Sequence, residues 1–77
     1  MTVMVDITPR AFLGESLMMD AAVETDRGQA LHLELRIDKH LSAMDMQEQI
    51  IEQVVGRCQV HGLDVMEANI LLFGLPV

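Results

Sequence analysis

The amino-acid sequence predicts an α+β protein, in which a small antiparallel sheet of three or four strands, in β-β-β-α-β order, carries one main amphipathic helix packed on one face. Three observations lead to this prediction. Residues 31–38 alternate between apolar and polar side chains, the pattern of a half-buried strand. Residues 46–58 carry apolar side chains at helical spacing. A turn sequence with glycine, at residues 26–28, separates two strand-like runs and indicates a hairpin.

The length and the apolar content together suggest an exposed apolar surface. With 77 residues, the chain is expected to form a single domain, residues 1–77. A domain this small removes only about 60% of its unfolded surface from water. Yet 51% of the residues are hydrophobic. We therefore expect some apolar side chains on the outside, where they usually mark an interface.

The first predicted strand covers residues 2–8, where apolar side chains alternate in part with polar ones. Pro9 ends it, because proline has no N–H to donate to a sheet. Residues 10–16 then form a connector, in which Phe12 and Leu13 are expected to lie on the core.

Two further strands follow, at residues 17–25 and 31–38. In the first of them, Leu17, Met19, Ala21 and Val23 share one face, and in the second, Leu31, Leu33, Leu35 and Ile37 share one face. Residues 26–28 between them have turn chemistry, with a glycine that is free to take a positive φ.

The helix is predicted to begin after Ser42, which with Asp45 fits a capping box, and to end near residue 60 or 61. Its apolar stripe consists of Met46, Ile50, Ile51, Val54, Val55 and Cys58. Gly56 costs about 1 kcal/mol in a helix relative to alanine. Close contact between its backbone and the sheet would explain its presence.

The last part of the chain has two interpretations. A second helix would begin near Asp64 and be ended by Gly74 and Pro76. Alternatively, residues 69–73 form a short buried strand; apolar runs of this length do not distinguish the two. We favour the strand, because the preceding helix would then cross the sheet and return the chain to it.

The net charge is −7, with twelve acidic residues against five Lys and Arg, and Lys39 is the only lysine. Direct binding of nucleic acid needs clustered cations, so we do not expect it. For the same reason we expect no binding to anionic membrane surfaces. No apolar run approaches the ~18 residues of a membrane-spanning helix, and the first residues lack the basic start of a signal peptide. The expected location is cytoplasmic, and the lone Cys58 permits no internal disulfide.

One group of side chains is a candidate metal-binding site. His32, Glu34, Arg36, Asp38 and His40 alternate along the third strand and its extension, and would share a face. Two imidazoles and two carboxylates are metal-ligand types. However, Arg36 would repel a cation, and the spacing matches no recognised ligand motif. We interpret these residues as a solvated sheet face, with no metal and no cofactor.

The single thiol of the chain is a candidate catalytic nucleophile. Cys58 and His61, three residues apart on the helix, can be neighbours. The mechanism normally needs a third group that orients the base, and none is evident. Cys58 also belongs to the apolar stripe, where a thiol is an inert small hydrophobe. We therefore predict no catalytic residues and no enzymatic activity.

The function that remains is binding. We predict a non-enzymatic, small, acidic protein-interaction module, such as an inhibitor or accessory factor, for a basic or nucleic-acid-handling protein partner. The predicted partner-binding residues are Glu34, Arg36, Asp38, Glu48 and Glu52. One alternative is a structural subunit of a homo-oligomer, such as a homodimer formed through strand edges or the tail, residues 72–77. A second alternative is a small enzyme with an active site shared at a subunit interface, where the only candidates for acid–base work are His32, His40 and His61.

Overall fold

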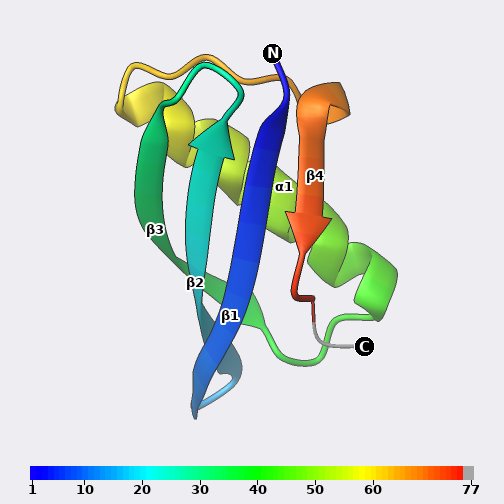
Figure 1. The fold of residues 1–77 in the computed structure, drawn as a ribbon. Coiled ribbons are helices and arrows are strands. Elements are labelled where there is room, and N and C mark those ends of the chain that lie inside the picture. Colours follow the sequence, from blue (N-terminus) through cyan, green and yellow to red (C-terminus); the bar gives the residue numbers. More distant parts are fainter. Residues whose placement is uncertain (76–77) are drawn as a thin grey trace.

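The computed structural model describes residues 1–75 and has two layers, a four-stranded sheet and a helix (Figure 1). In chain order the elements are β1 (Val3–Leu13), β2 (Ser16–Thr25), β3 (Ala30–Asp38), α1 (Ala43–Val60), the short 3₁₀ helix η1 (Glu67–Asn69) and β4 (Ile70–Phe73). The predicted α+β class and β-β-β-α-β order are confirmed.

The strand order in the sheet is β3-β2-β1-β4. β1 pairs with β2, and β2 with β3, in antiparallel fashion. β4 runs parallel to β1, so the sheet is mixed and not purely antiparallel as predicted. Figure 1 shows the reason: α1 crosses the back of the sheet and ends near the end at which β1 begins. The chain then enters β4 from the same end as β1 and runs in the same direction.

The core lies between the sheet and α1. Alternate residues of the strands face the helix, and each of the predicted faces is confirmed, apart from Leu31, which is only partly buried. The buried apolar strand residues are Val3, Val5 and Ile7 of β1; Leu17, Met19, Ala21 and Val23 of β2; Leu33, Leu35 and Ile37 of β3; and Ile70 of β4. From the helix, Ile50, Val54 and Cys58 pack against them.

β1 is longer than predicted, because it continues through Pro9 to Leu13 with an irregularity in its register between Pro9 and Ala11. Among the described residues, β4 pairs only with Val3–Asp6, so the second half of β1 has β2 as its one neighbour in the sheet. An edge position with a bulge is where a strand tolerates proline. This half forms a hairpin with β2 that projects past α1 (Figure 1). Phe12 and Leu13 near its tip are 69% and 57% exposed, so the prediction that they lie on the core is wrong.

The helix agrees with its prediction at both ends. The Ser42 hydroxyl accepts a hydrogen bond from the Asp45 N–H at 3.2 Å, which is N-terminal capping. Gly56, however, is exposed, and a Cβ placed on it would meet nothing within 4 Å. The expected close contact between Gly56 and the sheet is therefore wrong. Among residues 1–75, no helix combines the length and the apolar character needed to cross a membrane.

The end of the chain is a strand, as favoured above, preceded by one 3₁₀ turn. Phe73 lies beside Asp6, the last residue of β1 that pairs with β4. Pro76 and Val77, part of the tail that was considered as an oligomer contact, lie outside the described residues.

Candidate functional site: the open face of the sheet

The sheet has one face that no other part of residues 1–75 covers, because α1 packs on the opposite face. The pairing places the side chains of this open face in rows across the strands. One row consists of Leu71, Met4, Glu24 and Ala30, and the next consists of Phe73, Asp6, Ala22 and His32. Both rows combine apolar and charged groups.

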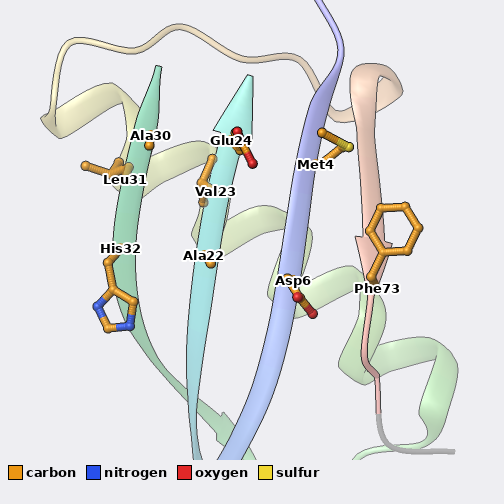
Figure 2. A pocket seen from close by; sticks show the side chains of 9 residues that line it. All are labelled: Met4, Asp6, Ala22, Val23, Glu24, Ala30, Leu31, His32 and Phe73. Atoms are coloured by element: carbon orange, nitrogen blue, oxygen red, sulfur yellow. The ribbon is translucent and has the colours of Figure 1, made fainter. Parts of the chain in front are cut away.

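Apart from Leu71, the residues of these two rows line a shallow groove with a volume of about 540 Å³, together with Val23 and Leu31. The methyl side chain of Ala22 leaves its floor low between the longer side chains of Asp6 and His32 (Figure 2). Figure 2 shows Met4 on β1 and the Phe73 ring on β4 on the far side of the groove from β3. Met4 and Phe73 are 42% and 51% exposed, which leaves much of their apolar surface in water.

The carboxylates of Asp6 and Glu24 also line the groove. Within residues 1–75, neither of them forms an ion pair. Each carboxylate therefore keeps its charge uncompensated beside an apolar surface. In a chain with a net charge of −7, this combination favours a ligand that is both cationic and apolar.

The neighbouring part of the open face, toward the hairpin tip, differs in its electrostatics. The guanidinium of Arg10 lies 3.2 Å from the Asp20 carboxylate and 3.8 Å from that of Glu34. The His32 imidazole lies 3.6 Å from the same Asp20 carboxylate. The charge of Arg10 offsets part of the charge of these two carboxylates, so this part of the face attracts a cationic partner less strongly than the groove does.

The structure divides the predicted partner-binding residues between two layers. Glu34, Arg36 and Asp38 lie on the exposed side of β3, whereas Glu48 and Glu52 are exposed on α1. Glu34 faces Arg10, and Asp38 accepts a hydrogen bond from the His40 N–H at 2.9 Å. The five residues therefore do not form one site.

The histidines of the considered metal cluster are also separated in the fold. His32 lies in the groove, whereas His40 lies beyond the end of β3 and contacts the carboxylate of Glu15 in the loop between β1 and β2. In the described part of the chain, no three His, Cys, Asp or Glu side chains are grouped in a way that would hold a metal ion.

The thiol of Cys58 is fully buried in the core between α1 and the sheet. Burial raises the pKa of this thiol above its ordinary value of 9.0, because a thiolate would lose its solvation. His61, by contrast, is exposed just beyond the end of the helix. A protonated, buried thiol is a poor nucleophile.

In the sequence, Met4, Asp6, Ala22 and Glu24 alternate with the buried apolar residues of their strands, but nothing singles them out as a site. Their signal is the same period-two alternation that located the strands. Phe73 carried no such signal, because the continuous apolar run of residues 70–73 hides which of its side chains face outward.

Comparison with models of protein families, with curated proteins and with solved structures finds no match to this chain.

Proposed function

We propose that this chain is a non-enzymatic, acidic protein-interaction module, and that its groove binds a basic segment of a partner protein that also carries apolar side chains. The observation that supports the proposal is the groove itself, in which Met4 and Phe73 stand half exposed beside the unpaired carboxylates of Asp6 and Glu24. An inhibitor or accessory factor of a nucleic-acid-handling protein is one form of this function, since such partners present basic surfaces.

The chemistry of the groove fits this ligand in two ways. Aromatic residues and methionine are enriched in the buried centres of interfaces, and methionine adapts its shape to different partners. Carboxylates at the margin of such a patch accelerate the approach of a cationic partner and orient it. The aliphatic stem of a lysine or arginine of the partner can pack against Met4 and Phe73, while its charged end pairs with Asp6 or Glu24.

The proposal is tested by affinity capture from an extract of the host cell, with quantification by mass spectrometry. The baits are the wild-type chain, a Phe73→Ser variant and an Asp6→Asn/Glu24→Gln variant. Val60→Ser serves as a matched control, because Val60 is 82% exposed on α1, away from the groove. We expect a basic protein to be captured by the wild type and the control and reduced about tenfold by each groove variant, as at the centre of an interface.

Salt dependence provides a second measurement in the same experiment. Capture should weaken as the salt concentration rises, since exposed charges are screened. A partner that the groove variants capture as well as the wild type does, or one whose capture is unaffected by salt, would contradict the proposal.

A second candidate function is that of a structural subunit of a homo-oligomer. It is favoured by the exposed Phe12 and Leu13 near the tip of the projecting hairpin. Sedimentation velocity over a range of concentrations tests it, with Phe12→Ser as the variant that should abolish self-association. A monomer at every concentration would contradict this candidate and leave the first one standing.

A further inference from the structure

We propose that the partner segment adds to the sheet as a fifth strand along the free edge of β4, with apolar side chains toward the open face and lysine or arginine side chains toward α1. This inference rests on the proposed function and deepens it, because it specifies the conformation, the position and the side-chain pattern of the segment that is bound. The proposal rests on three observations: the free edge of β4, its apolar composition and the position of α1.

The two outer edges of the sheet differ in their protection. β3 carries charged side chains along its exposed face, and the Gln53 side chain donates a hydrogen bond to the Arg36 carbonyl at 3.0 Å. Charges and covered backbone groups are the means by which proteins protect an edge strand against further pairing. β4 has the sequence Ile-Leu-Leu-Phe, with no charge and no proline. Its edge is therefore the one suited to accept a strand.

The backbone of β4 has groups available for pairing. In a strand that pairs on one side only, alternate residues direct their N–H and C=O groups toward the free side. Within residues 1–75, the Ile70 N–H donates a hydrogen bond to the Glu67 carbonyl at the end of η1. The other hydrogen bonds of turns, loops and side chains do not involve the backbone of residues 71–73, which pair only with β1. An added strand would satisfy these groups, as in recognition by β-strand addition.

The helix provides a surface beneath the added strand. Figure 1 shows that the first turns of α1 extend sideways past β4, so the helix layer is wider than the sheet at this edge. Beside the edge, Ile51 lines a hollow together with the carboxylates of Glu48, Glu52 and Glu67. None of these three carboxylates forms an ion pair within the described residues.

These positions define the side-chain pattern of the added strand. Leu71 and Phe73 of β4 face the open side, so neighbouring side chains of the added strand on that side should be apolar and extend the groove surface. Leu72 faces the helix layer, and side chains on that side approach the hollow of carboxylates. Because successive residues of a strand point to opposite faces, the expected pattern alternates apolar and cationic residues.

The same charges disfavour a second copy of this chain at this edge. Pairing of two β4 strands about a twofold axis would bring two sets of Glu48, Glu52 and Glu67 together, in chains that each carry a net charge of −7. Like charges brought together at an interface disfavour association. A foreign basic strand removes this cost, so it is the occupant that we propose.

The test is an NMR titration of the ¹⁵N-labelled full chain with an acetylated, amidated octapeptide that alternates valine and lysine. We expect saturable shifts centred on the amides of Ile70–Phe73, together with slower hydrogen exchange at the β4 amides that face outward. Two control peptides have the same sequence, one with N-methylated valines and one with N-methylated lysines. Each keeps the charge and the apolar character but lacks the N–H groups along one of its two edges, because successive residues direct these groups to opposite edges. One of the two should bind about tenfold more weakly, since the edge that pairs with β4 has then lost its strand hydrogen bonds.

Matched variants test the charges. Glu48→Gln/Glu52→Gln should weaken binding of the octapeptide about fivefold, as expected for partly exposed ion pairs. Glu15→Gln/Asp64→Asn removes the same charge from two loops that do not line this hollow, and should leave the affinity unchanged. Equal effects of the two double variants would overturn the proposal, because the attraction would then be one of net charge alone.

Other outcomes separate this inference from the proposed function. Binding of both N-methylated peptides as tightly as the unmodified peptide, or shifts confined to Met4, Asp6 and Ala22, would overturn the fifth strand and leave the groove as the binding surface. A free protein that dimerises through β4 would also overturn it, with a second copy as the occupant. Loss of partner capture by all groove variants, with no shifts at β4, would support the proposed function and reject strand addition.

Discussion

Gly74 lies directly against the backbone carbonyl of Ile7, at the point where the chain leaves β4. A Cβ placed on Gly74 would overlap that carbonyl oxygen and would lie 3.1 Å from the Asp6 carboxylate. Its φ of +77° is in the left-handed region, which favours glycine. This contact holds the end of β4 close to β1, and with it the Phe73 side of the groove.

Replacement of this glycine should therefore be costly. Gly74→Ala should lower the free energy of unfolding by more than about 2 kcal/mol, because the left-handed backbone alone costs about 1–2 kcal/mol with a Cβ. Gly14 is the matched control: its φ is +60°, but a Cβ there would meet nothing within 4 Å. Gly14→Ala should cost only the backbone strain. Urea unfolding of both variants measures the difference, and equal losses would mean that the contact with Ile7 is unimportant.

Gly56 offers the opposite change, because it lies on the exposed side of α1 with open space around its Cα. Gly56→Ala should raise the free energy of unfolding by about 1 kcal/mol, since alanine loses less backbone entropy in a helix. The measurement is again urea unfolding, with an unchanged dependence on urea concentration as the sign that the fold is the same. A loss of stability would show that Gly56 has a contact within the fold.

Because the Cys58 thiol is buried, we expect the free energy of unfolding to depend on pH in the alkaline range. Burial raises its pKa above the ordinary value of 9.0, so between the two pKa values the folded state holds a proton that the unfolded state has released. Stability therefore falls as the pH rises from the unfolded pKa toward the folded pKa. Below the unfolded pKa, both states are protonated and the thiol contributes no pH dependence.

The control for this prediction is Cys58→Ala, which should lose about 1 kcal/mol through the small cavity but lack this part of the alkaline decline. Urea unfolding of both proteins at pH 7, 9 and 10 isolates the effect as the difference in slope between them. Identical slopes would contradict it, as would rapid reaction of the folded protein with a thiol reagent at pH 8.

The sequence predicted the local structure well wherever a side-chain period was unbroken. The alternation of residues 31–38 gave both the strand and its buried face, and Ser42 marked the start of α1. The prediction failed at Pro9, because a proline ends a strand only where its N–H is needed, and that depends on the neighbouring strand. It also failed for Phe12 and Leu13, whose apolar side chains lie on a hairpin that extends beyond the helix.

The sequence by itself determined the helix, the strands at residues 2–8, 17–25 and 31–38, and which side of each of these strands is apolar, because these follow from local periodicity. Only the tertiary structure decided that β4 lies beside β1 and runs parallel to it. That pairing brings Phe73 next to Asp6, creates the groove and leaves the apolar edge of β4 free. The physical reason is that a period of two fixes the face of a strand but not its neighbour. The neighbour of β4 is decided by where α1, packed across the sheet, returns the chain.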